Sequence, residues 1–508
     1  MQPQAQQSQP NPQQVFEEAY RLLRQGDAYE AAKRAGKLRA HFPDDVPVLT
    51  LHGIVLARLG IHPQALSDLI KAAQLTEHAL ANEEGENPNR PRIVNQLVQL
   101  SVQICYSSMK IGEYKAAEEA IELALKWDPD RGDAVAAKAE LLALQGNTDK
   151  GLKLIAQGQK DVLESFPLVV SKARIVLGQE KPDPKNIESV IKELETESQV
   201  SGLGGYELGE ILRLLGTAND RIERVDNAFN AFRRAAKLRR GTYDPRAYTM
   251  MTTKVIHDWT GEAMGKMIKP EESGEKIVLL LGAPMSGVNQ LAEMLGQFDD
   301  VRVVGPLETL SSVCMHNLGA RQGVLRPVPF EPSKLRGGQL KEAQVAYTNH
   351  INAMAGGATR AIDTHSLNIP LAGAAAAFLP GVHIVMCRRD PMESTLACYC
   401  DAMVGNHPFA GDLVNAAGFV ADCNRMMDHW ATILGDESIG ANIIEVQYAD
   451  LERDPKKTAS KVAREIGLDA RATSVKSVPS FERGPGSNPK AYEQHTRVIE
   501  GFFDHAGV

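Results

Sequence analysis

The sequence has little of what marks membrane-spanning, secreted or nucleic-acid-binding proteins. No stretch approaches the ~18 consecutive apolar residues that a membrane span requires, and the N-terminus, MQPQAQQSQPNPQQ, has neither the basic region nor the apolar run of a secretory signal. The formal net charge of −8 gives no general attraction to nucleic acid or to an anionic membrane surface. We therefore expect a cytoplasmic protein without a membrane span or a nucleic-acid partner, in which a local cluster of donors holds any anionic ligand.

Cysteine is scarce as well. The 508 residues include six cysteines, and Cys105 lies far from the other five, so we expect no disulfide framework. Cys398 and Cys400 are two positions apart, but no second pair with metal-ligand spacing lies nearby. Reduced and buried thiols are therefore predicted, and a metal site is not.

The length of the chain exceeds what one hydrophobic core usually organises, so at least two domains are expected. Apolar residues make up 43% of the chain and charged residues 24%, which is an ordinary globular composition. Residues 1–14 are rich in Gln and Pro and contain almost nothing to bury. They are predicted to form a disordered tail.

A pair of small residues recurs along the N-terminal half. Four pairs share the pattern: Gly26 with Ala31, Gly60 with Ala65, Gly112 with Ala117, and Gly146 with Gly151. The glycines of the first two pairs, and of the last two, are 34 residues apart, and the longer interval between them contains the polar insert 78–92, which we expect to be a loop. Repeated helical hairpins need a small residue at the turn and another where the two helices cross closely. The pattern resembles the tetratricopeptide repeat (TPR), and it predicts an all-α solenoid over residues 15–260, with a concave face that suits a peptide or a partner protein.

The pattern changes after residues 261–275, whose Gly, Pro and charged residues are typical of a linker. The run KIVLLLG that follows is short, apolar and bounded by glycine, as in a strand buried on both faces of a parallel sheet. Similar runs recur at 301–305, 359–363, 382–387 and 442–448. They alternate with helical stretches, which predicts a doubly wound α/β domain over residues 276–508 that binds ligands at the carboxyl ends of its strands.

The first of these strands runs into a glycine-rich loop that opens a helix. From Gly282 to Gly287 the loop has the spacing of a P-loop, in which successive backbone N–H groups point at a phosphate. Val288 and Asn289 stand where a nucleotide-hydrolysing P-loop has Lys and Ser or Thr, which disfavours ATP or GTP hydrolysis with magnesium. From the loop alone, a phosphate site and a turn that binds no ligand are equally open.

Two arginines follow the strand at 382–387. Arg388 and Arg389 stand just before an Asp-Pro helix start, at the edge of the sheet where the glycine loop also opens. A pair of guanidinium groups in that place is suited to clamp an anion. The alternative is that the two arginines form ordinary surface ion pairs.

Together these segments resemble the sulfotransferase superfamily, in particular its bacterial branch fused to TPRs, over about residues 277–470. The family's loop reads Pro-Arg/Lys-Ser-Gly-Thr-Thr and grips the 5′-phosphosulfate end of the donor 3′-phosphoadenylyl sulfate (PAPS), and here Met285 replaces its cation. The family's later Arg-Asp-Pro segment holds the donor's 3′-phosphate with the Arg and with a Ser, whose place Ala397 takes. The resemblance implies PAPS as the donor and no metal. The implied donor site consists of Gly282, Pro284, Ser286, Gly287, Val288, Asn289, Arg388 and Arg389.

Two residues are candidates for the base that deprotonates an acceptor hydroxyl. In the family's cytosolic branch the base is the His of a Thr-His pair after a strand, which corresponds to Thr364 and His365. In its protein-tyrosine and repeat-linked branches the base is a Glu after the second strand, which corresponds to Glu308. Either an imidazole or a desolvated carboxylate can accept the proton as the S–O bond forms. The structural alternatives are that His365 caps a helix and that Glu308 is a solvated neighbour of a helix N-cap.

The departures from the family pattern leave two functions open. Met285 in the loop and Thr364 after the third strand stand where family members have cations, and one such donor typically contributes ~10²–10³ in rate. The first function is a PAPS-dependent sulfotransferase that acts on a hydroxyl of a carbohydrate, peptide or small molecule, while the TPRs recruit substrate or partner. The alternative is a catalytically inactive, sulfotransferase-like adaptor. A nucleoside-triphosphate enzyme is disfavoured by the absent Lys, and no motif in 310–340 identifies the acceptor.

Overall fold

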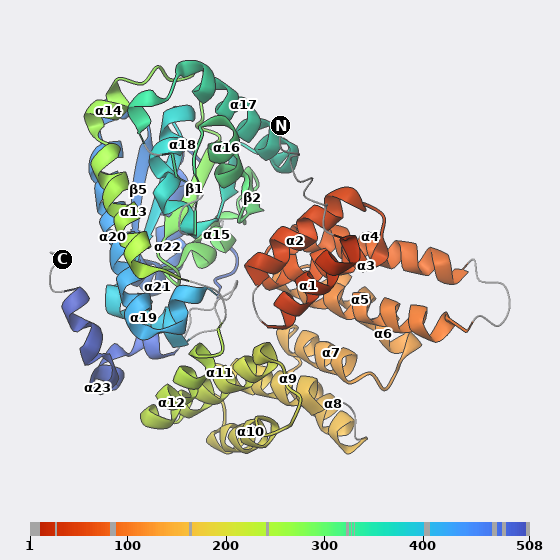
Figure 1. Cartoon of the computed structure of the whole chain (residues 1–508). Coiled ribbons are helices and arrows are strands. Elements are labelled where there is room, and N and C mark those ends of the chain that lie inside the picture. Colours follow the sequence, from red (N-terminus) through yellow and green to blue (C-terminus); the bar gives the residue numbers. More distant parts are fainter. Residues whose placement is uncertain are drawn as a thin grey trace, which may run out of the picture. The chain divides into compact units, whose positions relative to one another are not determined.

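The computed structural model describes residues 11–503, except 26–27, 82–87, 162–164, 240–242, 322–324, 327, 330, 401–406, 470–474 and 480–483. The chain forms two compact units: Met1–Gly241 with Cys400–Gly411, and Thr242–Tyr399 with Asp412–Val508. In Figure 1 the first unit runs from red to yellow-green, and most of the second runs from green to blue. Residues 1–10 of the predicted tail lie outside the described residues, and the first helix begins at Pro12.

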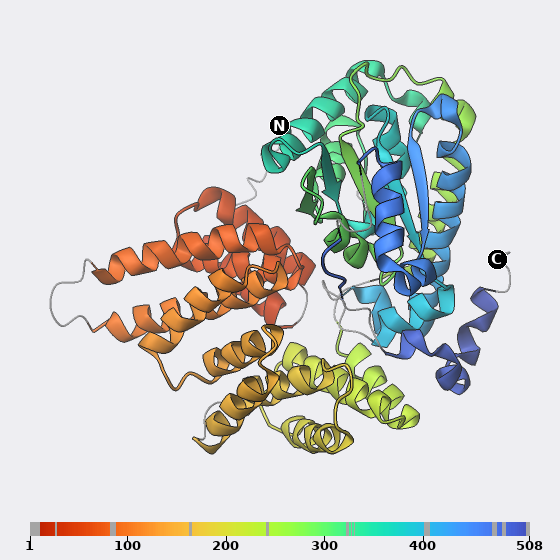
Figure 2. The same ribbon diagram turned by 180° about the vertical axis from the view of Figure 1, so that it is seen from behind.

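The described residues of the first unit form helices and no strands. These helices are α1 (Pro12–Arg24), α2 (Ala28–His41), α3 (Val46–Arg58), α4 (His62–Ala81), α5 (Arg90–Lys110), α6 (Tyr114–Trp127), α7 (Gly132–Leu144), α8 (Thr148–Lys160), α9 (Ser165–Leu177), α10 (Pro184–Glu197), α11 (Gly205–Arg221) and α12 (Val225–Ala236). Each odd-numbered helix packs against the even-numbered helix that follows it, and successive pairs contact one another. Figures 1 and 2 show the pairs stacked in chain order. The prediction of an all-α repeat region is confirmed.

The small residues at the helix turns and crossings explain the repeat. Gly60, Gly112 and Gly146 follow their helices with φ of +76°, +78° and +82°, a left-handed conformation that residues with side chains rarely adopt. At one crossing, a Cβ on Gly151 would lie 2.6 Å from a backbone oxygen of the facing helix, so a side chain does not fit there. The structure therefore contains the predicted hairpins at these positions, while Gly26 lies outside the described residues.

The insert over residues 78–92 differs from its prediction as a loop. Helix α4 continues to Ala81 and α5 begins at Arg90, which gives these helices 20 and 21 residues. Pro91 falls in the first turn of α5, where the missing N–H of proline has no intrahelical partner to lose. The two ends of this polar stretch therefore extend two helices, while residues 82–87 of the predicted loop lie outside the described residues.

The second unit contains a five-stranded parallel sheet with the order β2-β3-β1-β4-β5. Its strands are β1 (Ile277–Gly282), β2 (Val301–Gly305), β3 (Arg360–Asp363), β4 (His383–Arg388) and β5 (Asn442–Gln447). All five lie at the apolar runs that predicted them. Every residue of β1, the central strand, is buried, as expected for a strand covered on both faces. The predicted fold class is confirmed.

Helices cover both faces of this sheet (Figures 1 and 2). The helices that follow β1 along the chain are α15 (Val288–Leu295), α16 (Thr309–Asn317), α17 (Gly337–Ala355), α18 (Ala372–Phe378), α19 (Pro391–Cys400), α20 (Leu413–Leu434), α21 (Tyr448–Arg453), α22 (Pro455–Glu465) and α23 (Glu493–Thr496), and not all of them lie on the sheet. On one face, Val278 and Leu280 pack into a core with Leu291 of α15 and Val462 of α22. Helices α17, α18 and α20 pack around the sheet and against one another, together with the 3₁₀ segment η2 (Ser366–Leu371).

One helix that the sequence placed with the repeats belongs to the second unit. Helix α13 (Pro245–Asp258) packs on α20, where the Tyr248 and Phe419 ring centroids are 4.8 Å apart. The segment predicted as a linker, 261–275, begins with α14 (Gly261–Gly265), whose Met264 is fully buried. The pattern of apolar residues in a helix predicts that one of its faces is buried. It does not predict which domain that face packs against.

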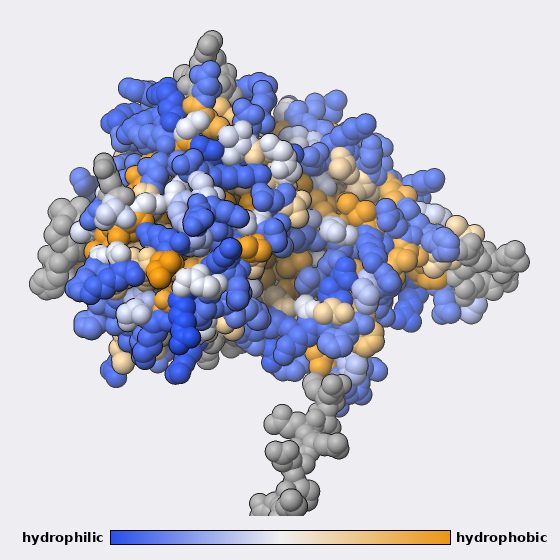
Figure 3. Space-filling model, turned by 90° about the horizontal axis from the view of Figure 1, so that it is seen from above, coloured by the Kyte–Doolittle hydropathy of each residue, from blue (hydrophilic) through white to orange (hydrophobic). Residues whose placement is uncertain are grey.

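The visible surface consists mostly of hydrophilic residues, drawn in blue in Figure 3. Exposed large apolar side chains do occur, including those of Met250 (72% exposed) and Ile268 (78% exposed). Scattered apolar side chains of this kind are normal on soluble surfaces. Among the helices of the described ranges, none combines the length and the apolar content that crossing a bilayer requires.

Candidate functional site

The residues singled out in the second domain follow four neighbouring strands. The loop 282–287 follows β1, Glu308 follows β2, His365 follows β3, and Arg388 and Arg389 end or follow β4. Because all strands are parallel, their carboxyl ends lie at the same edge of the sheet. In the order β2-β3-β1-β4, the loop has both base candidates on one side and both arginines on the other.

The glycines fix the path of the loop after β1. A Cβ on Gly282 would lie 2.6 Å from the backbone oxygen of Cys387, and one on Gly287 would lie 2.9 Å from the Tyr448 ring. Gly287 also has φ +93°, and the neighbouring Met285 has φ +67°. These close approaches and left-handed conformations require glycine at both ends of the loop.

The carbonyl groups of the loop accept hydrogen bonds from the segment after β4. Arg389 Nη1 donates to the Met285 oxygen at 3.0 Å, and Cys398 Sγ of α19 donates to the Pro284 oxygen at 3.4 Å. The amides of residues 288–290 form the first turn of α15 and have no intrahelical acceptor, so this helix start carries partial positive charge. The Ser286 hydroxyl is buried and has no partner in the described part of the chain. This combination fits a bound anion such as a phosphate group.

Arg389 holds the loop in place. Its side chain is 2% exposed, its Nε donates to Glu393 at 3.1 Å, and its guanidinium lies 4.2 Å from the centre of the Tyr448 ring. With the bond to Met285, these contacts use two N–H groups at the edge of the guanidinium and one of its faces. Arg389 is therefore a positioning residue for the loop in this structure.

Arg388 turns to different partners. Its Nε and Nη2 donate to Glu445 Oε1 at 2.9 and 2.7 Å, and its Nη1 donates to Asp428 Oδ1 at 2.6 Å. The structure therefore brings Arg389 to the loop and gives Arg388 the ion pairs that the sequence left as the alternative. The two arginines do not form a joint clamp.

The position that the family resemblance assigns to the 3′-phosphate is covered by protein. The segment η6 (Pro485–Ser487) packs on α19, where a Cβ on Gly486 would lie 2.8 Å from the Cβ of Ala397. Ala397 has no hydroxyl, and Arg389 is engaged as described above. The residues present thus fit the phosphosulfate end of a donor at the loop, but they do not form the family's grip on a 3′-phosphate.

Both base candidates meet in one cluster with an arginine that the sequence did not reveal. His365 Nε2 lies 3.2 Å from Glu308 Oε1, and Arg326 donates to Glu308 Oε2 at 2.5 Å and to His365 Nδ1 at 2.8 Å. Arg326 also donates to the Ser311 hydroxyl at 3.1 Å. The side chain of Arg326 is 5% exposed and that of Glu308 is 51% exposed. The buried guanidinium therefore holds a carboxylate that faces solvent.

The hydrogen bonds of this cluster indicate which tautomer the neutral imidazole of His365 adopts. A guanidinium only donates, so Nδ1 of His365 accepts from Arg326 and the proton of the neutral ring lies on Nε2, from which it is donated to Glu308. In this arrangement Nδ1, the nitrogen with the lone pair, is already occupied. Glu308 keeps an exposed carboxylate with two donors behind it, which favours Glu308 over His365 as the base.

A buried carboxylate ties together the loops that carry Glu308 and His365. Asp363 Oδ1 accepts the backbone N–H groups of Leu307 at 3.2 Å and His365 at 3.0 Å, and its Oδ2 accepts the Tyr347 hydroxyl at 3.1 Å. Burial raises the pKa of Asp363 to about 6, although these three bonds oppose the rise. Asp363 thereby fixes the ends of β2 and β3 relative to each other.

Arg326 lies in the stretch 310–340, where the sequence showed no motif. It follows Glu308 by 18 residues and precedes His365 by 39, so no local spacing connects the three. The cation that the family resemblance led us to expect at Met285 or Thr364 is absent from both positions. The backbone N–H of Thr364 instead donates to the Gly305 oxygen at 3.2 Å, a bond between neighbouring strand ends.

Parts of the chain are similar to known proteins. Residues 278–472 match the model of the sulfotransferase family. An uncharacterized protein of Aquifex aeolicus (strain VF5) is 21% identical over 310 residues, which are 58% of this chain and 39% of that protein, so the chain spans about two fifths of this relative's length. The crystal structure of yeast Tom70 is similar over 46% of this chain and 44% of its own, with 19% identity and a TM-score of 0.31. Residues 278–472 are therefore similar to a sulfotransferase-family domain, and they follow an all-α region of helical repeats.

Proposed function

We propose that the C-terminal domain transfers a sulfuryl group from PAPS to a hydroxyl of a carbohydrate, a peptide or a small molecule, and that the protein acts in the cytoplasm. The observation that supports this most is the Glu308 carboxylate, which Arg326 and His365 hold at the sheet edge where the glycine loop opens. The helical repeats would recruit the substrate or a partner protein on their concave face.

The loop would hold the phosphosulfate end of the donor. The free amides of residues 288–290 and the orphaned Ser286 hydroxyl would donate to its oxygens, and Gly282 and Gly287 leave room for the backbone to approach them. Val288 and Asn289 would take part through their backbone N–H groups, because neither side chain carries the charge of a P-loop lysine. Pro284 has no N–H to donate and would only shape the loop, where its carbonyl accepts from Cys398 Sγ. Arg389 would act by keeping the loop in shape, while Arg388 would take no part.

In the proposed reaction the acceptor oxygen forms a bond to sulfur. The bond between sulfur and the oxygen of the 5′-phosphate breaks, and adenosine 3′,5′-bisphosphate leaves with that oxygen. The acceptor proton passes to Glu308, whose two carboxylate oxygens are already oriented by Arg326 and His365. No cation stands at Met285, so the loop amides and the start of α15 would stabilise the charge on the leaving group.

This reaction can be tested with the full chain and PAPS. A panel of acceptors with phenolic, serine and sugar hydroxyl groups would be incubated with both, and adenosine 3′,5′-bisphosphate and sulfated product would be measured. We expect equal amounts of the two products with at least one acceptor class. Release of bisphosphate at the same rate with and without every acceptor would contradict the proposal.

A second function is favoured by a specific observation. Arg388 and Arg389 both have carboxylate partners and Met285 carries no charge, as expected of a domain that has lost turnover and serves as an adaptor. Such an adaptor would bind adenosine 3′,5′-bisphosphate, or no nucleotide at all, without transferring sulfate. The absent loop lysine still argues against a nucleoside triphosphatase.

Replacing Arg326 with alanine is expected to lower the rate of transfer while donor affinity stays unchanged. The change removes the Arg326 donor to His365 Nδ1 and one of the two donors to Glu308, and it takes a positive charge away from the imidazole, which favours protonation of that ring. We expect a fall in kcat of about 10–100-fold and a new ionisation in the pH profile of kcat. Kinetics and a melting curve would be recorded together.

Arg326→Lys separates charge from geometry. Lysine keeps the positive charge, but a single ammonium group does not reproduce the planar fork that reaches Glu308 and His365 at once. The lysine variant should melt close to the wild type and still show the reduced kcat. Full activity of the alanine variant with an unchanged pH profile would show that Arg326 only packs.

A further inference from the structure

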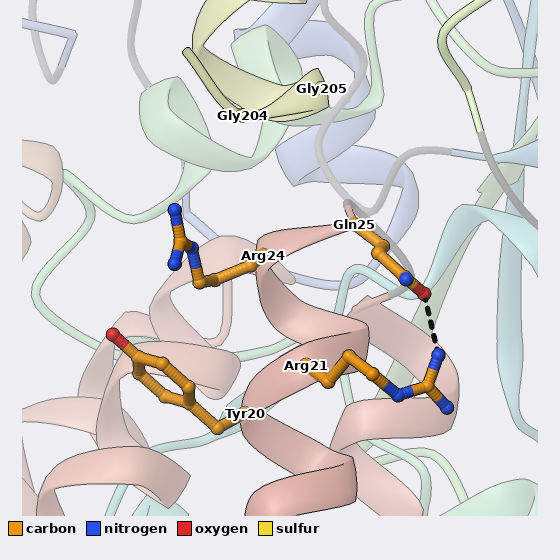
Figure 4. A pocket seen from close by; sticks show the side chains of 6 residues that line it. All are labelled: Tyr20, Arg21, Arg24, Gln25, Gly204 and Gly205. Atoms are coloured by element: carbon orange, nitrogen blue, oxygen red, sulfur yellow. Dashed lines mark hydrogen bonds between the residues drawn. The ribbon is translucent and has the colours of Figure 1, made fainter. Parts of the chain in front are cut away.

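A cavity with a positive rim lies within the first unit, apart from the transferase domain. It has a volume of about 410 Å³ and lies between the last turn of α1 and the start of α11. Its lining residues are Tyr20, Arg21, Arg24, Gln25, Gly204 and Gly205. Figure 4 shows the Arg24 guanidinium and the Tyr20 ring below the backbone of Gly204, with Arg21 turned toward Gln25.

The arginines of this cavity have no carboxylate partner among the residues that the structure describes. Arg21 donates only to the neutral Gln25 side chain, at 3.1 Å, and Arg24 makes no ion pair. The nearest acidic residues on the same helix are used elsewhere: Glu17 accepts from Gln13 at 3.3 Å, and Glu18 pairs with Arg34 at 3.1 Å. Two arginines thus have no carboxylate partner in the described part of a chain whose net charge is −8.

The start of α11 forms the opposite wall, and an exposed tyrosine with an arginine over its ring follows it. Gly204 caps the N-terminus of α11 and Gly205 begins it, and the Glu207 carboxylate accepts the Gly204 N–H at 2.6 Å, which offsets the partial positive charge of this helix start. The next residue, Tyr206, has the guanidinium of Arg58 over its ring at 3.6 Å. Arg58 also forms no ion pair in the described ranges, and Tyr206 is 38% exposed. Three guanidinium groups and exposed aromatic rings therefore lie along one stretch of surface.

We infer that this cavity binds a peptide segment rich in aspartate or glutamate. Carboxylates pair with guanidinium groups through two parallel hydrogen bonds, and neither Arg21 nor Arg24 has a carboxylate partner in the described ranges, where Arg21 donates only to the neutral Gln25. The negative net charge of the whole chain repels an extended polyanion such as nucleic acid, whereas a short acidic segment meets only the local positive field. The inference rests on the proposed recruiting role of the repeats, but not on sulfuryl transfer.

Binding would be measured with the full-length protein and a fluorescein-labelled hexaglutamate peptide, with hexaglutamine as the neutral probe. The test variant is the double substitution Arg21→Ala with Arg24→Ala. The matched control is Arg233→Ala with Arg234→Ala, which also removes two exposed arginines from the last turn of a helix, α12, and so changes the net charge equally. All four residues are exposed or near the surface, so neither variant disturbs a core.

We expect hexaglutamate to bind and hexaglutamine not to bind. The affinity for hexaglutamate should fall by about tenfold or more in the test variant, stay within about twofold in the control, and weaken with added salt. Equal losses in the two variants would show that only net charge matters and would overturn the inference. Displacement of the peptide by inorganic phosphate at equal concentration would also overturn it, because the cavity would then be a site for small anions.

Discussion

Replacing Glu308 with glutamine is expected to reduce the rate of sulfuryl transfer by about 10²–10⁴-fold, the usual contribution of a general base. The amide of glutamine has nearly the same shape but cannot take the acceptor proton. Arg326 is buried, so losing the charge of its partner should also lower stability, although the glutamine oxygen can still accept a hydrogen bond from the guanidinium. Initial rates with saturating PAPS and acceptor would measure the effect, and a melting curve would confirm an intact fold.

His365→Ala is the matched comparison for this test. In the structure the imidazole donates to Glu308 and accepts from Arg326, so its removal should loosen the carboxylate without removing the base. We expect a smaller loss of rate than in Glu308→Gln. If Glu308→Gln retained near-normal activity while His365→Ala abolished it, the assignment of roles would be wrong and His365 would be the base.

Replacing Asp363 with alanine is expected to destabilise the C-terminal domain by about 3 kcal/mol or more. The change leaves two backbone N–H groups and the Tyr347 hydroxyl buried without an acceptor, and each such loss typically costs about 1–3 kcal/mol. Asp363→Asn keeps an oxygen for both N–H groups, and its amide can donate to the Tyr347 hydroxyl, so it should remain within about 1 kcal/mol of the wild type at pH 7. Urea unfolding followed by tryptophan fluorescence suits this test, because Trp259 and Trp430 are buried in this unit.

The difference in stability between the wild type and Asp363→Asn should also depend on pH. The pKa of Asp363 is raised to about 6 by burial, so between about pH 4 and 6 the folded domain binds a proton that the unfolded chain does not. The contribution of this group to stability is complete below pH 4 and is lost as the pH rises through about 6. The free energy of unfolding of the wild type, minus that of Asp363→Asn, should therefore fall by at most about 1.4 kcal/mol for each unit of rising pH in this window. Parallel pH profiles for the two proteins would contradict the raised pKa.

Local patterns in the sequence predicted the elements of the fold, because those patterns have local causes. Runs such as the one at 277–282 are apolar on both faces, and only a strand covered from both sides buries such a run efficiently. The turn glycines predicted the repeats because a left-handed residue after a helix has few substitutes. The carboxyl-end rule for parallel sheets then placed the glycine loop, Glu308, His365 and Arg389 at one edge.

Contacts between distant segments could not be read in this way. Arg388 and Arg389 are adjacent, and the sequence gives no reason to distinguish them. Arg388 nevertheless pairs with Asp428 and Glu445, which lie 40 and 57 residues away, whereas Arg389 donates to the Met285 carbonyl. Arg326 contributes to the site from a stretch in which the sequence shows no motif. Helix α13 packs on α20 of the second unit, although in the sequence it directly follows the repeats. In each case the outcome depends on a partner that has no fixed spacing from the residue concerned.

The central claim, that the loop 282–289 holds the phosphate end of the donor, is tested most directly by calorimetric titration of the full chain with adenosine 3′,5′-bisphosphate. We expect one site per chain and, at a ligand concentration of 100 times Kd, about 2.7 kcal/mol of added stability. Gly287→Ala should abolish binding because its Cβ would press on Tyr448, whereas Gly440→Ala, also at positive φ but in open space, should bind as the wild type does. Absence of binding to the wild type, or equal binding by Gly287→Ala, would contradict the account.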